Sequence, residues 1–328
     1  MKKLIAILLL TAICVLGISA CSAPEDNTTI RIGYLTGPTG MGMAKLINDN
    51  GGVNGNEKYS FKRYEDPQVA VEDLAANNID LICMPTNDAA VYYNGNKNIN
   101  VLSINTLSSI FLVSDKNTTI TSFAELEGKT IYTCKKGNPK PVMEYLIKQS
   151  GINATVTDQY NGKTIASPKE LGSYLTEGKL DLAVVPEPIL TSSLLTIKSN
   201  ANTDIEYSID LAISDVWNTY AESGKALAMG CIVGNAEFVK NHKTAINNFL
   251  EEYKASIEFV NASENLETAA QYIADAQIMA KPAPAKVALK NLHGAIAYVD
   301  GEDMKATLEG VFKALNVTLP DDDFYYEK

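Results

Sequence analysis

Short apolar runs alternate with amphipathic segments along the first third of the chain. The runs at residues 30–35, 59–64 and 79–84 have the length and the side-chain types of buried strands. Between them, apolar positions recur at helical spacing, which predicts a helix over residues 41–50 and another that opens at Asp66-Pro67. Strands that alternate with helices in this way favour βαβ units and a mostly parallel sheet. We therefore expect an α/β fold.

The same order of elements starts again in the middle of the chain. Strands are predicted at residues 130–134 and 180–185, and helices at residues 141–148 and 167–176. Asp80 and Asp181 each begin the sequence Asp-Leu-x-x-x-Pro, in which a buried strand ends at a proline that starts a helix. This shared pattern indicates two related lobes. The alternative is that any buried strand followed by a capped helix gives the same pattern.

The last third of the chain is predominantly helical. Two strands are predicted at residues 205–211 and 227–233, and helices follow at residues 236–239, 242–261, 266–274, 285–292 and 304–315. A helical tail of this length needs a sheet to cover, and the first sheet is the expected partner. The first lobe is then discontinuous in sequence. We expect residues 30–110 and 212–328 in lobe 1 and residues 111–211 in lobe 2.

The N-terminus has the pattern of a bacterial lipoprotein signal peptide. Two lysines precede an apolar run at residues 4–16, and small residues then lead into Cys21. The run is shorter than the roughly 20 residues that span a bilayer, which favours a cleaved export signal over a membrane-spanning helix. We expect residues 1–20 to be removed, Cys21 to be lipidated, and the polar residues 21–29 to form a tether. An ordinary secretory signal with an incidental cysteine is the alternative.

The charge balance of the chain disfavours some partners. The full sequence has a net charge of −11, and loss of the two signal-peptide lysines would leave 26 basic and 39 acidic residues, a net charge of −13. Such a surface repels nucleic acid and anionic lipid head groups. Arg31 and Arg63 are the only arginines. An anionic ligand would therefore be held mainly by lysine, hydroxyls or backbone N–H groups.

The cysteines and histidines indicate neither a metal site nor a histidine-based active site. After processing, Cys83, Cys134 and Cys231 remain, an odd number for an exported protein. Cys83 and Cys231 lie in apolar strand-like segments, where we expect small buried hydrophobic side chains rather than a disulfide. The two histidines, His242 and His293, have no cysteine or histidine at ligand spacing. We therefore expect no metal, no cofactor and no histidine general base.

Four turns lie where predicted strands end and helices begin. They are found at residues 37–41, 86–88 and 135–138 and at Glu187. Open α/β sheets bind ligands at the carboxyl ends of their strands, where helix N-termini present free N–H groups and a positive dipole end. If the two lobes face each other across a hinge, all four turns converge on one cleft. Closure of that cleft would bury a small molecule.

Together these features resemble the substrate-binding lipoproteins of bacterial ABC importers, in the branch that includes the nitrate, sulfonate, taurine and thiamine-pyrimidine binding proteins. The residues that carry the resemblance are the lipoprotein signal, Ile30-Arg31-Ile32-Gly33-Tyr34, the glycine-rich turn before Met41, the two Asp-Leu strands, Val185-Pro186-Glu187-Pro188 and Asp215-Val216-Trp217. The resemblance implies a type II periplasmic-binding-protein fold with hinge strands near residues 107–114 and 205–214. It also implies delivery of a ligand to a membrane permease that a cytoplasmic ATPase powers.

The resemblance further implies which residues contact the ligand. Backbone N–H groups of the 37–41 turn would face the ligand, and Glu187 would accept from an amino or hydroxyl group. The expected ligand-binding residues are Tyr34, Gly37, Thr39, Gly40, Met41, Thr86, Asn87, Asp88, Lys136, Gly137, Asn138, Glu187 and Trp217.

Several of these residues have a structural alternative. Tyr34 and Trp217 would stack on a flat ligand, but they also fit rim packing and core packing, respectively. Glu187 fits a residue that favours its helix N-terminus, and Asp88 fits a helix cap. The sequence leaves these alternatives open.

We therefore expect a monomeric, lipid-anchored solute-binding protein on the extracytoplasmic face of the cell membrane. The scarcity of arginine, together with Glu187 and Asp88, favours a neutral, zwitterionic or aromatic nitrogenous ligand. One alternative is a lyase on the same fold, which the export signal and the lack of a histidine-containing constellation disfavour. A second alternative is a surface lipoprotein that presents its ligand to a sensor or acts as an adhesin.

Overall fold

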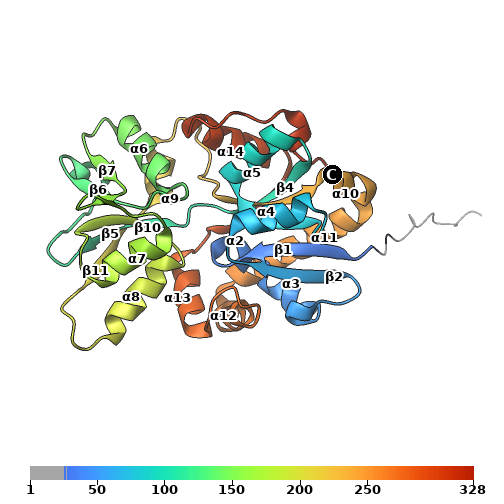
Figure 1. The fold of residues 1–328 in the computed structure, drawn as a ribbon, viewed down its shortest axis with the longest axis horizontal. Coiled ribbons are helices and arrows are strands. Elements are labelled where there is room, and N and C mark those ends of the chain that lie inside the picture. Colours follow the sequence, from blue (N-terminus) through green and yellow to red (C-terminus); the bar gives the residue numbers. More distant parts are fainter. Residues whose placement is uncertain (1–25, 27) are drawn as a thin grey trace, which may run out of the picture.

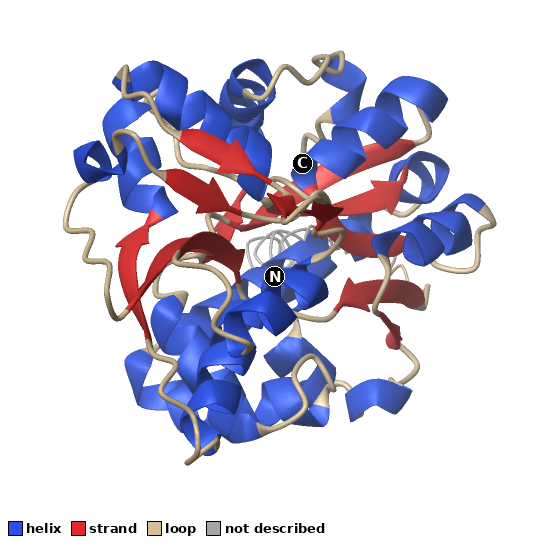
Figure 2. Cartoon of the chain, turned by 60° about the vertical axis from the view of Figure 1, so that its left-hand side comes forward, coloured by secondary structure: helices blue, strands red, loops and turns tan. Residues whose placement is uncertain are grey.

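Two β-sheets with helices packed around them divide the chain into two lobes in the computed structural model (Figures 1 and 2). The structure describes residue 26 and residues 28–328. The predicted signal peptide at residues 1–20 and the predicted lipidation site Cys21 lie outside the described residues. Among the helices of the described part, none combines the length and the apolar character needed to cross a membrane.

The first lobe contains a six-stranded sheet in the order β13-β4-β12-β3-β1-β2. Its strands are β1 (Ile30–Leu35), β2 (Tyr59–Tyr64), β3 (Leu81–Pro85), β4 (Ile99–Thr106), β12 (Gly230–Asn235) and β13 (Ile296–Val299). β1 is parallel to β2 and β3, whereas β12 is antiparallel to β3 and β4. The strands predicted at residues 30–35 and 59–64 are confirmed with their bounds. Their parallel pairing follows from the helical crossover between them.

The second lobe contains a five-stranded sheet in the order β11-β5-β10-β6-β7. Its strands are β5 (Ile110–Asp115), β6 (Thr130–Tyr132), β7 (Thr155–Thr157), β10 (Leu182–Pro186) and β11 (Tyr207–Ala212), with a separate hairpin of β8 (Gln159–Tyr160) and β9 (Lys163–Thr164). β10 is parallel to β6 and antiparallel to β5, just as β3 is parallel to β1 and antiparallel to β12. The two Asp-Leu strands thus occupy equivalent positions, which supports the predicted relation between the lobes.

Helices pack around both sheets. Those of the first lobe are α2 (Pro38–Met41), α3 (Ala44–Asp49), α4 (Pro67–Ala75), α5 (Thr86–Asn96), α10 (Ala236–Asn241), α11 (Lys243–Asn261), α12 (Leu266–Asp275), α13 (Pro282–Asn291) and α14 (Gly301–Ala314). Those of the second lobe are α6 (Pro139–Ser150), α7 (Pro168–Thr176), α8 (Ile189–Ser199) and α9 (Ile213–Tyr220). α11 contacts β13, α3 and α12, so the C-terminal helices cover the first sheet as predicted. The Asp66 carboxylate caps α4 by accepting from the Gln68 N–H group (2.9 Å).

The chain crosses between the lobes at residues 107–109 and at residues 221–229. The first crossing joins β4 to β5, and the second joins α9 to β12. α9 packs against α6, β5 and β11 because its apolar face, which includes Val216 and Trp217, is buried on the second sheet. The predicted return to lobe 1 at residue 212 is therefore one helix too early. β5 and β11, which we expected as hinge strands, belong to the second sheet.

The helix predicted over residues 41–50 is interrupted at Gly42 and Met43. The Ser256 hydroxyl of α11 donates to the Gly42 carbonyl (2.6 Å) and accepts from the Leu46 N–H group (3.0 Å). A Cβ atom at Gly42 would lie 2.6 Å from Cγ1 of Ile257. α11 therefore approaches the backbone so closely that glycine is required, and its serine replaces part of the helical hydrogen bonding.

The three cysteines of the described chain are buried and free. Cys83 and Cys231 lie on the neighbouring strands β3 and β12, but the register pairs Cys83 with Ile232 and Cys231 with Met84. Successive side chains of a strand point to opposite faces, so the two thiols lie on opposite faces of the sheet. The expectation that Cys83 and Cys231 are small buried hydrophobic residues is confirmed.

The described part of the predicted tether contacts the first lobe. The Asp26 carboxylate lies 3.1 Å from Nδ1 of His242, at the junction of α10 and α11. The Thr29 hydroxyl donates to the Glu57 carbonyl (2.5 Å). Regular structure begins at Ile30, one residue later.

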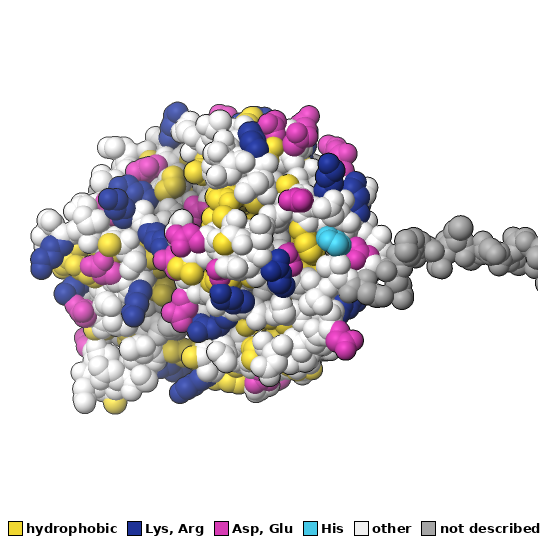
Figure 3. Space-filling model, turned by 45° about the vertical axis from the view of Figure 1, so that its right-hand side comes forward, with side chains coloured by type: hydrophobic (Ala, Val, Ile, Leu, Met, Phe, Trp, Pro, Cys, Tyr) yellow, Lys and Arg dark blue, Asp and Glu magenta, His cyan; other side chains and the backbone are white. Residues whose placement is uncertain are grey.

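Surface charges of both signs are mixed on the face that Figure 3 shows. Both arginines form ion pairs: Arg31 Nη2 lies 2.5 Å from Asp80 Oδ1, and Arg63 Nη1 lies 3.0 Å from Glu65 Oε1. Each guanidinium is thus already matched by a carboxylate of its own lobe.

Candidate functional site

The predicted ligand-facing turns lie where parallel strands of the two sheets end. In the first lobe, β1 leads to the turn at Gly37, and β3 leads directly into α5. In the second lobe, β6 leads to the turn at Lys136, and β10 leads to Glu187. Contacts between the lobes bring these turns together in pairs, and we call the boundary that they line the interlobe cleft.

One contact joins Gly37 to the turn that precedes α8. Gly37 has a φ of 87°, a left-handed conformation that favours glycine. A Cβ atom at this position would lie 3.0 Å from Cδ of Pro188. The lobes therefore approach each other here at a distance that leaves little room for a side chain.

A second contact joins the start of α5 to the turn before α6. The Asn87 amide donates to Oδ1 of Asn138 across the cleft (3.1 Å). Beside it, Nζ of Lys136 lies 3.8 Å from Oδ1 of Asp66 in the first lobe. Gly137, between Lys136 and Asn138, has a φ of 92°, which lets the turn present both side chains to the other lobe.

A third contact centres on Glu187, which is buried with 4% of its surface exposed. Oε1 accepts from the Thr191 hydroxyl (2.8 Å) and from the Asn291 amide of α13 in the first lobe (2.8 Å). Oε2 accepts from the Thr191 N–H group (3.2 Å). Burial raises the pKa of Glu187, and the hydrogen bonds from Asn291 and Thr191 oppose that shift. Glu187 thus caps the start of α8 and also links the lobes.

Asp88 differs from Glu187 because its side chain keeps contact with solvent. Desolvation by the surrounding protein raises the pKa of Asp88, and the positive charge of Lys136 from the other lobe lowers it. Asp88 lies in the first turn of α5, where a carboxylate also complements the helix dipole. The N-cap position of α5 is Pro85, which supplies no side-chain cap. As an exposed carboxylate, Asp88 can accept a hydrogen bond from solvent or from a guest.

Seven buried side-chain atoms have no hydrogen-bond partner in the described part of the chain, and three of them belong to residues in or next to the ligand-facing turns and the first crossing. These three are Oδ1 of Asn87, Oγ of Ser108 and Oγ1 of Thr133. Asn87 starts α5, Ser108 lies in the first crossing, and Thr133 follows β6. Buried polar groups are almost always paired, so unpaired ones indicate a missing partner.

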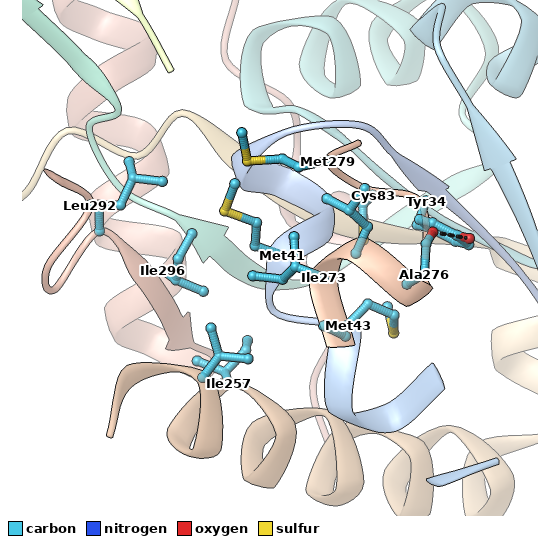
Figure 4. Close-up of a cluster of buried hydrophobic side chains, with 14 of the residues drawn as sticks. Tyr34, Met41, Met43, Cys83, Ile257, Ile273, Ala276, Met279, Leu292 and Ile296 are labelled. Atoms are coloured by element: carbon cyan, nitrogen blue, oxygen red, sulfur yellow. Dashed lines mark hydrogen bonds between the residues drawn. The ribbon is translucent and has the colours of Figure 1, made fainter. Parts of the chain in front are cut away.

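Tyr34 and Met41 are corrections to the expected site, because both side chains are buried in the core of the first lobe (Figure 4). The Tyr34 hydroxyl donates to the Ala276 carbonyl (2.9 Å). Met41 lies in the same apolar cluster and has no exposed surface. The alternation of side chains along a strand places Tyr34 on one face of β1. Whether that face is buried depends on the C-terminal helices, which are distant in sequence.

Trp217 and Thr86 are also corrections. Trp217 is fully buried, and its indole N–H group donates to the Lys225 carbonyl (2.8 Å), so no ring face is free for stacking. Thr86 is fully buried, and its hydroxyl donates to the Ala228 carbonyl (3.0 Å). Both residues hold the second crossing in place instead.

The glycine N–H groups of the 37–41 turn are already engaged. Gly37 donates to the Ile278 carbonyl (3.3 Å), and Gly40 donates to the Gly37 carbonyl (3.0 Å). A Cβ atom at Gly40 would lie 2.0 Å from the Leu35 carbonyl oxygen, so this glycine serves close backbone packing. The carbonyl of the half-buried Thr39 accepts from the Asn105 amide (3.2 Å). These residues shape the turn. The N–H groups of Gly37 and Gly40, which we expected to contact a ligand, already donate within the protein in this structure.

Sequence reasoning missed Asn291 and Ser108. Asn291 is separated from Glu187 by 104 positions, and it lies at the end of a helix without a distinctive motif. Ser108 lies in a short serine pair between two apolar strands. The serine pair at the junction of two strands is the one local signal that points to a polar crossing.

Comparisons with known proteins identify the fold as that of type II periplasmic binding proteins. An ABC transporter protein from Parabacteroides distasonis is 18% identical, with a TM-score of 0.71 over 92% of this chain and 99% of that chain. The aliphatic sulphonate binding protein SsuA of Escherichia coli is 15% identical, with a TM-score of 0.66 over 92% of each chain. The nitrate-binding protein NrtA of Synechocystis PCC 6803 is 12% identical, with a TM-score of 0.57 over 85% of this chain and 75% of that chain.

The sequence itself identifies the family. The model of the NMT1/THI5-like family matches residues 58–264, which extend from the first lobe through the whole second lobe and back. The chain therefore belongs to the NMT1/THI5-like family. No curated protein matches the sequence.

Proposed function

We propose that this protein captures a small solute between its lobes and delivers it to an ABC importer. The observation that carries the proposal is that strand-end turns of the two lobes meet at Gly37–Pro188 and Asn87–Asn138, that Glu187 reaches Asn291 at the end of α13, and that Oδ1 of Asn87 lacks a partner. A guest that pairs with polar atoms of both lobes is held only when the lobes are closed. The fold shared with SsuA and NrtA supports the same function.

The proposed ligand is neutral or zwitterionic and carries nitrogen donors. Oδ1 of Asn87 and the Asp88 carboxylate accept hydrogen bonds, whereas both arginines are paired within the first lobe. An anion-binding site would favour a free guanidinium. Tyr34 and Trp217 are buried, so neither offers a ring face for stacking on an aromatic ligand.

Capture is proposed to occur at the extracytoplasmic face of the membrane, by a monomer anchored through lipidated Cys21. The signal pattern before Cys21 supports this location. A permease and a cytoplasmic ATPase are the expected partners. Cys21→Ser should release the protein from the membrane fraction, and continued membrane association would contradict the anchor.

We propose binding and delivery rather than a lyase reaction. The buried Glu187 has both carboxylate oxygens engaged in holding α8 and the opposite lobe. Long incubation of the isolated complex, followed by analysis of the guest, tests this proposal. An unchanged molecule is expected, and a converted one would favour an enzyme.

A thermal-shift screen tests the ligand class. Amines, amino acids and neutral heterocycles should include compounds that raise the midpoint of unfolding, because a ligand that binds only the folded state stabilises it. Simple alkanesulfonates serve as the matched anionic set. Stabilisation by alkanesulfonates alone would overturn the ligand class while leaving solute capture intact.

A further inference from the structure

A pocket lies where the two crossings between the lobes run close together. Its volume is about 290 Å³, and residues of both crossings line it, among them Ser108 and Leu227. The start of α9 and the turn between α13 and β13 complete its wall. None of the residues expected to bind ligand in the cleft lines this pocket. We call it the hinge pocket.

One buried polar group of the hinge pocket has no partner in the described chain. Ser108 is 5% exposed, and its hydroxyl makes no hydrogen bond there. A buried hydroxyl without a partner is unfavourable. The Ser108 oxygen has almost no exposed surface, so a guest in the pocket pairs with it only when the crossing moves.

The charge of the hinge pocket is negative. Asp215 and His293 are the ionisable side chains of the wall, Asp215 supplies its one carboxylate, and no described lysine or arginine lines it. The Asp215 side chain is exposed and lies in the first turn of α9, where the helix dipole stabilises its negative charge. The amides of Asn218 and Asn291 add polar groups, while Leu107 and Phe111 give an apolar surface. A carboxylate beside an apolar surface suits a small organic cation.

The wall of the hinge pocket is connected to the contact between the lobes. Asn291 lines the pocket and also donates to Glu187 (2.8 Å). The carbonyl of Ser109, next to Ser108, accepts from the Glu187 N–H group (2.9 Å). Opening of the lobes that moves Glu187 away from Asn291 would therefore change the shape of the pocket.

We propose that the hinge pocket is a second binding site, that it takes a small organic cation, and that its occupation biases opening and closing of the lobes. The volume is at the small end of ligand pockets, as expected for a guest of the size of choline. The binding step is independent of the proposed solute capture. The bias on closure rests on that proposed function, because it uses the same movement of the lobes.

The protein carries its own reporter for this test. Trp217 is the only tryptophan, it lies two residues after Asp215, and its indole donates to the carbonyl of Lys225, the neighbour of the pocket residue Ala226. Fluorescence of the full chain is titrated with choline and with its uncharged isostere, 3,3-dimethylbutan-1-ol. We expect a saturable change with choline and at least tenfold weaker binding of the isostere.

Three variants test whether choline binds in the hinge pocket. Asp215→Asn should weaken its binding at least tenfold, whereas Asp204→Asn, at a side chain that is 96% exposed in the second lobe, removes the same charge without effect. Asn138→Ala, in the cleft, should leave choline binding unchanged. Equal affinity for the isostere, equal losses in the two aspartate variants, or no saturable signal would overturn the hinge site.

Two outcomes separate this site from the cleft. Loss of choline binding in Asn138→Ala, matching that in Asp215→Asn, would assign the cation to the cleft and overturn the hinge site, while solute capture would stand. Small-angle scattering tests the bias: saturating choline should change the radius of gyration of the wild type and not that of Asp215→Asn. An unchanged radius in the wild type would overturn the bias.

Discussion

The two Asp-Leu-x-x-x-Pro strands end in junctions that differ in what they do. Pro85 leads directly into α5, so Asn87 and the solvent-accessible Asp88 lie at the start of a helix that faces the other lobe. Pro186 is followed instead by Glu187 and Pro188, which pack against the first lobe before α8 begins. The comparison teaches that both junctions contact the other lobe, but one keeps an exposed carboxylate at its helix start, whereas the equivalent one buries its carboxylate in the contact.

The two aspartates that begin these strands differ most strongly, and their replacement should have the largest effect. The Asp80 carboxylate is buried and accepts from the Arg31 N–H group (2.8 Å), Nε (3.0 Å) and Nη2 (2.5 Å). Asp181 is exposed. Asp80→Ala should lower the free energy of unfolding by about 2–3 kcal/mol, because buried charge-assisted hydrogen bonds are lost. Asp181→Ala should lower it by less than about 0.5 kcal/mol. Equal losses in urea denaturation would show that the aspartates are equivalent after all.

The contact between Glu187 and Asn291 should have the next largest effect. Asn291→Ala removes one donor from a buried carboxylate, which should lower the free energy of unfolding by about 1–2 kcal/mol and favour open lobes. Lys290→Ala, at the exposed neighbouring residue, is the matched control. Urea denaturation and small-angle scattering measure the two effects. If both variants behave alike, Asn291 does not link the lobes.

The pH dependence of stability should also distinguish Glu187. Because burial raises its pKa above the ordinary value of 4.5, folded Glu187 holds a proton at pH values where the unfolded chain has lost it. The stability of the wild type relative to Glu187→Gln should therefore rise as the pH falls from the raised pKa to 4.5, and level off below it. Denaturation over a pH series checks this. A relative stability that falls on acidification contradicts the buried position of the carboxylate.

The smallest effect is expected at the exposed junction. Lys136→Ala should raise the pKa of Asp88, because the lysine charge that lowers it across the cleft is removed. The change in unfolding free energy should be below about 1 kcal/mol, as for other solvent-exposed ion pairs. Titration of Asp88 by NMR measures the direction in which its pKa changes. An unchanged pKa would mean that Lys136 does not face Asp88 in solution.

Much of the fold could be predicted because its signals are local. β1 and β2 follow from short apolar runs between turn residues, and the start of α4 follows from the Asp66 cap beside Pro67. The discontinuous first lobe follows from the need of the C-terminal helices for a sheet. The break at Gly42 was not predictable, because Ser256 of a distant helix causes it.

The candidate site was less predictable than the fold. The turns were found, because strand ends and helix starts have local sequence signals. The roles of single residues depend on distant partners: Ala276 receives the Tyr34 hydroxyl, Lys225 receives the Trp217 indole, and Asn291 reaches Glu187. Side-chain type alone does not distinguish an aromatic residue that stacks on a ligand from one that fills the core.

Native mass spectrometry of the purified protein tests most directly whether a small molecule binds between the two lobes. The wild type and a variant with Asn87→Ala and Asn138→Ala, which removes the paired amides from both sides of the cleft, are compared under identical conditions. We predict that one small molecule per chain accompanies the wild type and that its occupancy falls at least tenfold in the variant. Equal occupancy of the same molecule in both proteins would contradict a guest held between these turns.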